Sequence, residues 1–187
     1  MGLRGNTVTA RLSPAMLQLT DTRGAMTLNT NFDQKLFRMS LGQFVTGVTI
    51  VSTISTDGQP IACTVNSFSS VSIDPPLVLF SLACRKNSVA HFGPGRPFSV
   101  SVLSAGQRHL SDHFAKSYED KCEGLTFEYG HGGSPFIRDA VSIFEGIVSA
   151  NHQGGDHVIV VGEVRHIRPG DTGASPLVFH RGQYASL

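Results

Sequence analysis

Two extended segments separated by a turn signal lie in the first half of the chain. Residues 48–54 read VTIVSTI, a run of mostly β-branched side chains, and an extended pattern resumes over residues 60–65. Asp57-Gly58 lies between them and is a strong turn signal, because glycine readily adopts the positive φ of tight hairpin turns. The pattern predicts an antiparallel β-hairpin.

Further strand signals follow along the chain. Strands are expected at 71–73 and 77–82, on either side of Pro75-Pro76. Residues 98–102 alternate Phe or Val with Ser, which is the period of a half-buried strand and predicts one face exposed to water. Residues 143–150 and 157–167 are also β-rich, and the sequence between them ends in QGGD, which has the composition of a hairpin loop.

Helices are few and short in this pattern. Asp33 is placed to cap a helix running from Gln34 to Phe44, and shorter helices are expected at 87–92 and 107–115. Six or more strands without regular βαβ alternation favour a mainly β fold, a closed antiparallel barrel, over a doubly wound sheet. A chain of 187 residues without an internal repeat or linker is expected to form one domain.

The first 31 residues differ from the rest. They carry Arg4, Arg11 and Arg23 against Asp21 alone and have no strong periodicity. We expect an N-terminal extension or arm over residues 1–31, or alternatively a transit-like leader, followed by the domain at 32–187.

Composition excludes several classes of partner. Lys and Arg number 15 against 14 Asp and Glu, so no charge excess predicts nucleic acid. No apolar run approaches the roughly 20 residues of a membrane span. The balanced charge favours small molecules as partners. Three widely spaced cysteines without a C-x-x-C pair indicate neither a disulfide framework nor a thiolate zinc site, and favour a cytoplasmic protein.

The segment from Thr64 to Leu79, TVNSFSSVSIDPPLVL, is rich in short polar side chains. Asn66 and the serines after it offer donors and acceptors on short stems, so a planar ligand with a polar rim could lie against the backbone. Ser and Asn are also the ordinary residues of turns, so the same segment is equally typical of a Ser-rich turn.

Two further segments are candidate ligand contacts. In ACRKNS (83–88), Arg85 and Lys86 precede an expected helix and would suit a phosphate, although a capped helix with two solvated cations has the same pattern. Gly155-Asp156-His157 lies at the predicted hairpin loop, where a histidine can contact a ring or be a plain turn residue.

Common catalytic motifs are missing from the sequence. It contains no G-x-S-x-G elbow, Walker loop or Rossmann G-x-G-x-x-G motif. His109 and His113 have a metal-compatible spacing, but HLSDH lacks the glutamate of HExxH and no third ligand is indicated. The distinctive residues are suited to binding rather than attack, which indicates chemistry supplied by a cofactor.

Five motifs in this order resemble one family. They are TGVTIV (46–51), DGQPIACTVNSFSSVSIDPPLVL (57–79), the loop at 81–88, GGDH (154–157) and FHRGQY (179–184). The set is similar to the short-chain flavin reductases, the reductase components of two-component flavin-dependent aromatic monooxygenases. The resemblance runs from about residue 32 to the end. It implies an FMN-binding split barrel of Greek-key antiparallel topology, a homodimer that binds FMN or FAD and reduces it with NADH or NADPH.

By position, the resemblance also implies site residues. Flavin contacts are expected along one edge and on an opposite wall, the phosphate at the following loop, and the nicotinamide at the GDH turn. The candidates are Thr64, Val65, Asn66 and Ser67; Ser81, Leu82 and Ala83; Cys84, Arg85, Lys86 and Ser88; and Gly155, Asp156 and His157, with Tyr184 as a further cofactor contact.

The expected reaction is hydride transfer from the nicotinamide to the flavin, with His157 holding the nicotinamide and a separate oxygenase receiving the diffusing reduced flavin. An oxidase of the pyridoxamine-phosphate-oxidase type would use the same barrel, but the GDH motif argues against it. The residues are also compatible with a non-catalytic flavin-binding protein or with a histidine metal-binding module.

Overall fold

The computed structural model describes residues 32–85, 87–116, 122–170 and 173–185. Two units are distinguished, Met1–Arg38, of which residues 32–38 are described, and Met39–Leu187. The predicted N-terminal arm at 1–31 lies outside the described residues. Within the described part of the chain, no helix has the length and apolar character needed to cross a membrane.

Helix α1 (Gln34–Leu41) begins where the sequence predicts. The Asp33 carboxylate accepts hydrogen bonds from the backbone N–H groups of Lys35 and Leu36, at 2.8 and 3.2 Å, which satisfies donors that the first helical turn leaves unpaired. The helix ends at Leu41 instead of Phe44, just before Gly42, a residue of low helix propensity. None of its side chains is buried.

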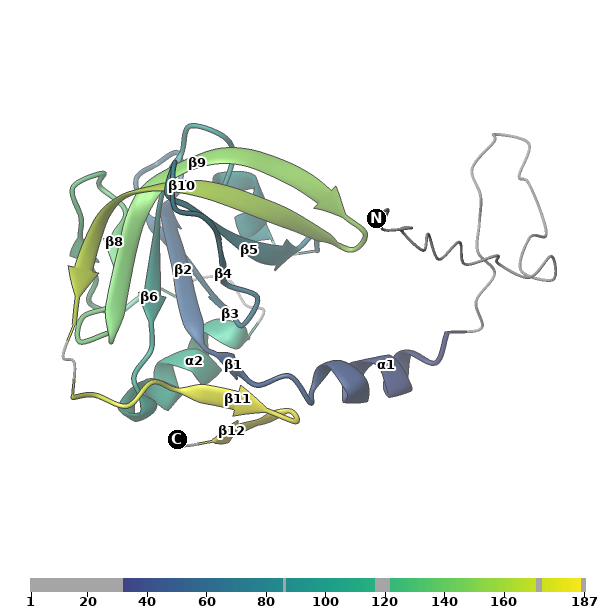
Figure 1. Ribbon diagram of the computed structural model, residues 1–187. Coiled ribbons are helices and arrows are strands. Elements are labelled where there is room, and N and C mark those ends of the chain that lie inside the picture. Colours follow the sequence, from purple (N-terminus) through teal and green to yellow (C-terminus); the bar gives the residue numbers. More distant parts are fainter. Residues whose placement is uncertain (1–31, 86, 117–121, 171–172, 186–187) are drawn as a thin grey trace, which may run out of the picture. The chain divides into compact units, whose positions relative to one another are not determined.

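Seven antiparallel strands form the main sheet, in the order β3-β2-β6-β9-β10-β5-β4 (Figure 1). Their bounds are β2 Thr49–Ile54, β3 Pro60–Val65, β4 Ser69–Ser72, β5 Leu77–Ala83, β6 Pro97–Val102, β9 Ser142–Gly154 and β10 His157–Pro169. The predicted hairpins are confirmed: β2 pairs with β3, and the long strands β9 and β10 pair on either side of a two-residue turn.

The sheet encloses the larger hydrophobic core. Strands β3 and β5 lie close together although they are not neighbours in the sheet order, so the sheet curls around the apolar side chains of its inner face. Phe80 packs edge-on against Phe92 and also contacts Phe98, which lies across the core on β6. A Cβ at Gly162 would lie 2.3 Å from the Phe98 ring, so this position needs glycine. The prediction of a mainly β, barrel-like fold is confirmed.

One strand prediction was wrong. Ser99 and Ser101 on β6 are fully buried instead of facing water. The Ser99 hydroxyl donates to the Pro135 carbonyl, and Ser101 accepts the Ile137 N–H at 3.1 Å, because β7 (Glu128–Tyr129), β8 (Pro135–Phe136) and the residues that follow cover this face. Alternating serines therefore reflect a second covered face with satisfied hydroxyls.

A second cluster of buried apolar residues lies outside the barrel. Helix α2 (Arg108–Ala115) follows the short helix η3 (Ala105–Gln107) and packs against β3. A separate sheet, β1-β11-β12, combines Thr46–Gly47, Val178–His180 and Gln183–Ala185 (Figure 1). Phe114 of α2 and Leu177 before β11 are both buried in this cluster, which brings the C-terminal hairpin beside the end of β3.

Candidate functional site

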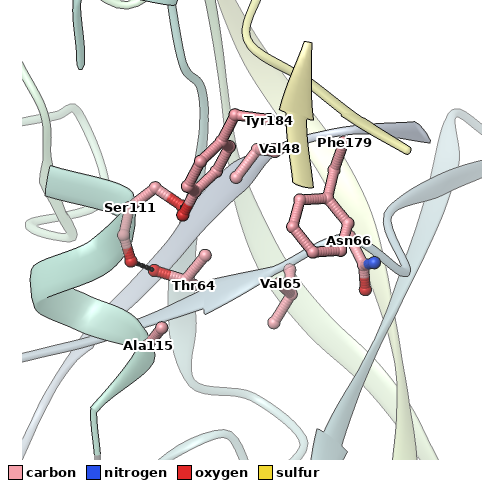
Figure 2. Close-up of a pocket in the computed structure, with 8 residues that line it drawn as sticks. All are labelled: Val48, Thr64, Val65, Asn66, Ser111, Ala115, Phe179 and Tyr184. Carbon is pink, nitrogen blue, oxygen red and sulfur yellow. Dashed lines mark hydrogen bonds between the residues drawn. The ribbon is translucent and has the colours of Figure 1, made fainter. Parts of the chain in front are cut away.

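A hollow of about 240 Å³ lies where the end of β3 meets α2 and the C-terminal hairpin (Figure 2). Alternation along β3 turns Thr64 away from the barrel core and toward α2, where its hydroxyl donates to the Ser111 carbonyl at 2.8 Å. Val65 faces the barrel core, and Asn66 is exposed beyond the strand end. The lining residues are Val48, Thr64, Val65, Asn66, Ser111, Ala115, Phe179 and Tyr184.

Tyr184 fastens the C-terminal hairpin to α2. Its hydroxyl lies 2.8 Å from the Asp112 carboxylate and 2.9 Å from the Ser111 hydroxyl, and the Arg108 guanidinium lies over its ring. Partial burial raises the pKa of the Tyr184 hydroxyl, and the neighbouring Asp112 carboxylate acts in the same direction. Tyr184 therefore closes one wall of the hollow as a neutral phenol.

A pair of serines joins β5 to the chain just after β3. The Ser67 hydroxyl oxygen accepts the Ser81 N–H at 2.8 Å and lies 3.3 Å from the Ser81 carbonyl, to which it donates. Its single proton is committed to this bridge. The bridge holds the part of the hollow that contains Asn66 beside the C-terminal half of β5.

The end of β5 meets the β9–β10 turn. His157 is paired with Ala83 in the sheet, and the Cys84 N–H donates to the Asp156 carbonyl at 2.9 Å. Gly155 has a φ of +70°, which a residue with a side chain rarely adopts. The turn composition read from the sequence therefore positions His157 next to Ala83 and Cys84.

Asp156 and His157 interact directly. The Asp156 Oδ1 lies 2.7 Å from His157 Nδ1. The hydrogen bond from the His157 side chain, followed by the charge of that ring, lowers the pKa of the Asp156 carboxyl. Because Nδ1 is engaged, Nε2 is the ring nitrogen available to a ligand.

The phosphate-loop candidates follow β5. Arg85 is exposed, Lys86 lies outside the described residues, and Ser88 is half-buried. The expected helix is the single-turn η2 (Asn87–His91), too short for a helix dipole to matter, so an anion here would depend on side chains and local N–H groups. The Ser88 hydroxyl lies 3.1 Å from the Cys63 sulfur.

Residues 41–187 match the family model described as "Flavin reductase like domain". The chain belongs to this family. The sequence-based resemblance to short-chain flavin reductases is thereby confirmed.

Named members of the flavin reductase family are similar over most of this chain. "FMN reductase (NADH) SmoA" of Agrobacterium fabrum is 40% identical over 81% of this chain and 85% of its own length. "Flavin-dependent monooxygenase, reductase subunit HsaB" of Mycobacterium tuberculosis is 32% identical over 86% of each. The chain spans about half (49%) of a longer relative, "Probable flavin reductase" of Rhizobium meliloti, at 36% identity over 82% of this chain.

A solved structure supports the family fold. "NADH:FAD oxidoreductase SgcE6" of Streptomyces globisporus, solved in complex with NAD and FAD fragments, covers 91% of this chain and 97% of its own, with a TM-score of 0.76 and 31% identity. The predicted split-barrel fold of the flavin reductase family is confirmed.

The structure brings most of the predicted site residues into two adjoining groups. Thr64, Val65, Asn66 and Tyr184 line the hollow, and Ala83, Cys84, Gly155, Asp156 and His157 meet at the β9–β10 turn. Ser67 and Ser81 connect the two groups. Leu82 differs, because its side chain is 1% exposed in the barrel core and only its backbone can face a ligand.

Sequence reasoning did not identify several residues that line the hollow. Ser111 and Ala115 lie one turn apart on α2, and Phe179 opens the FHRGQY motif without having been singled out. The FHRGQY motif, of which Phe179 is the first residue, was the local signal for this position. Nothing local could have indicated Ser111, since its place depends on the packing of α2 against β3. Among the residues that the structure describes, no group of His, Cys, Asp or Glu is arranged to hold a metal ion.

Proposed function

We propose that this chain is an NAD(P)H:flavin oxidoreductase that reduces FMN or FAD and supplies the reduced flavin to a partner monooxygenase. The observation that supports this most directly is the Ser67–Ser81 bridge, because it joins the residues beside the hollow to β5, and the end of β5 contacts the His157 turn. A hollow with a mostly apolar lining and a polar rim suits a planar ring, and the adjoining turn offers a histidine to a second ring.

We assign roles by position along this edge. Thr64, Val65 and Asn66 hold the flavin ring, and Ser67 and Ser81 fix the strand ends beside it. The loop from Cys84 to Ser88 holds the phosphate, with Arg85 adding a charge-assisted contact. Asp156 orients His157, and the free Nε2 of His157 contacts the nicotinamide.

The residues assigned above would hold a nicotinamide and a flavin side by side, and these two ligands would supply the hydride donor and the hydride acceptor. The protein's own contribution is to orient the two ligands and exclude water between them, and such orientation can supply about 7–11 kcal/mol of the barrier. Backbone N–H groups near Asn66 and Ser67 would stabilise negative charge on the reduced ring. No protein nucleophile is required, and none of the named side chains acts as one.

Reduced flavin would leave for a separate oxygenase. The similarity to a relative named as the reductase subunit of a flavin-dependent monooxygenase supports this role. The hollow also stands at the surface, bordered by exposed Asn66, which suits an exchangeable flavin. We also propose a cytoplasmic location, for which the free thiols of Cys63 and Cys84 are the supporting observation.

We further propose a homodimer. Large apolar side chains are exposed at seven positions between residues 32 and 45, namely Phe32, Leu36, Phe37, Met39, Leu41, Phe44 and Val45. Exposed apolar side chains gathered in one segment are typical of a surface that another chain covers. Light scattering after gel filtration tests the proposal, and a monomer at micromolar concentration would contradict it.

Turnover with each combination of two flavins and two nicotinamides tests the function. The purified protein is mixed with FMN or FAD and with NADH or NADPH, and nicotinamide absorbance is followed. We expect NAD(P)H consumption that depends on added flavin. Absence of consumption in all four combinations would contradict the proposal, and bound flavin that NADH fails to bleach anaerobically would favour a non-catalytic flavin-binding protein.

A further inference from the structure

A buried thiol contacts the loop that follows β5. Cys63 lies in the middle of β3 and is 0% exposed, and its sulfur is 3.1 Å from the Ser88 hydroxyl oxygen. Cys63 faces the barrel core, whereas its neighbour Thr64 faces the hollow. One strand therefore carries a residue that lines the hollow and a residue that contacts the loop.

Apolar packing of the residues that follow Ser88 in the chain fixes its position. Val89 packs against the barrel core, and Phe92 is completely buried against Phe80. The Phe92 carbonyl also accepts a hydrogen bond from the Asn151 side chain, at 2.9 Å. These contacts hold the η2 backbone, so the remaining freedom at Ser88 is the rotation of its side chain and hydroxyl proton.

The hydrogen-bonding capacities of the two groups determine what that contact can do. A serine hydroxyl has one proton and two acceptor lone pairs, and a thiol is a weak donor. An ionised phosphate only accepts hydrogen bonds, so a hydroxyl that binds it must donate its proton outward. The Cys63 S–H can then donate to the Ser88 oxygen from the core side, and the two hydrogen bonds are compatible.

We propose that Cys63 is a positioning residue for flavin binding: its thiol holds the Ser88 hydroxyl with its proton directed to the phosphate of the bound flavin. The inference rests on the proposed function, because it assumes that the loop at Ser88 holds that phosphate. It assigns to a buried core cysteine a contribution to affinity for phosphorylated flavins that riboflavin, which has no phosphate, does not share.

Equilibrium binding of FMN, FAD and riboflavin to the full chain tests the inference. Cys63→Ala removes the thiol and leaves space, Cys63→Val replaces the thiol with apolar atoms that fill the site, and Cys63→Ser keeps a donor. We expect Cys63→Ala and Cys63→Val to weaken FMN and FAD binding by about 2- to 12-fold, the range of one neutral hydrogen bond. Riboflavin affinity should change less than about twofold, and Cys63→Ser should restore most of the loss.

Two controls separate positioning from core damage. Val100→Ala removes apolar volume from the same core on β6, away from Ser88, and should leave the ratio of FMN to riboflavin affinity unchanged. In a Ser88→Ala background, Cys63→Val should cause no further loss of FMN affinity, because the group it positions is gone. Additive losses in the double variant would overturn the inference.

Failure of the inference and failure of the proposed function give different results. If the wild-type protein binds FMN and FAD more tightly than riboflavin, and Cys63→Val retains that preference, the positioning role of Cys63 is overturned. The assignment of the phosphate to the loop at Ser88 is then retained. If the wild-type protein binds riboflavin as tightly as FMN and FAD, the phosphate assignment of the proposed function is overturned and the positioning role with it. If Cys63→Ala does not fold, Cys63→Val provides the same comparison.

Discussion

The Ser67 hydroxyl accepts the backbone N–H of Ser81 at 2.8 Å, and this contact joins the polar end of β3 to β5. The sequence presents Ser67 as one of several similar serines, yet the Ser69 hydroxyl donates to the carbonyl of the next residue, and Ser69 is exposed. The two serines therefore have different roles. Ser67 holds the residues at the end of β3, where the flavin is proposed to lie, against β5. Ser69 is a surface residue of β4.

Ser67→Ala should lower the free energy of unfolding by about 1 kcal/mol, because it leaves the Ser81 N–H without its partner. The edge would then be held less firmly, and flavin affinity should fall about fivefold. Urea unfolding and flavin titration measure the two effects. Ser69→Ala is the matched control and should change neither. Equal flavin affinities in the two variants would contradict the assigned role of Ser67.

His157→Ala should raise the KM for NADH about tenfold, equal to about 1.4 kcal/mol, while flavin affinity stays the same. The reason is that His157 is proposed to contact only the nicotinamide. Steady-state kinetics at saturating flavin measure the change. His152 is exposed on the same hairpin, and His152→Ala should behave as wild type. An unchanged response to NADH in His157→Ala would make His157 a simple turn residue.

The Asp156–His157 contact has a definite pH dependence. Because the hydrogen bond from His157 lowers the pKa of Asp156, the contact is fully present above the ordinary carboxyl pKa and is lost as the pH falls through the lowered value. In His157→Ala, the pKa of Asp156 should therefore rise toward its ordinary value. Carboxyl carbon NMR follows this titration. The His152→Ala variant should leave it unchanged, and an unshifted Asp156 in His157→Ala would contradict the assignment.

Local sequence patterns predicted those parts of the fold whose partners are close in sequence. The β2–β3 and β9–β10 hairpins follow from strand periodicity and turn residues alone. The prediction for Ser99 was wrong because alternation records only that two faces differ, and the loop that covers its face is 36 residues away. Likewise, motif order indicated Thr64 and His157, whereas Ser111 joins the site through helix packing that no local pattern encodes.

The burial and the contacts of Glu145 are not indicated by the sequence. Glu145 lies on β9 with an exposed fraction of 1%, pairs with Arg168 of β10, and accepts the His131 N–H at 2.8 Å. A Cβ at Gly130 would overlap the Glu145 carboxylate, so a side chain at position 130 would displace the carboxylate from its present place. A single acidic residue in a strand gives no local sign that its carboxylate is buried against an arginine.

Arg168→Ala should lower the free energy of unfolding by about 3 kcal/mol, because it leaves the buried Glu145 carboxylate without its cation. The Arg165–Glu163 pair on the same strand is partly exposed, with its closest atoms 3.7 Å apart. Arg165→Ala should therefore cost less than about 1 kcal/mol. Urea unfolding compares the two variants, and similar losses would show that the Glu145 carboxylate does not depend on Arg168.

Tyr184→Phe should separate the role of the Tyr184 hydroxyl from that of its ring. The variant keeps the wall of the hollow but loses the contacts with Ser111 and Asp112, so we expect a loss of about 1 kcal/mol in the free energy of unfolding. Since the pKa of Tyr184 is raised, its contribution is fully present below the ordinary tyrosine pKa and is lost as the pH rises through the raised value.

The stability difference between wild type and Tyr184→Phe should therefore shrink in alkaline solution, where the unfolded chain ionises this phenol first. Urea unfolding at neutral and alkaline pH measures the difference. Tyr129 is 55% exposed, so Tyr129→Phe is the control for loss of a phenol hydroxyl and should change stability at neutral pH little. Flavin affinity should also fall in Tyr184→Phe, because the C-terminal hairpin that carries Phe179 depends on this hydroxyl to stay against α2. A variant with wild-type stability at neutral pH would assign the attachment of the hairpin to ring packing and the Arg108 contact alone.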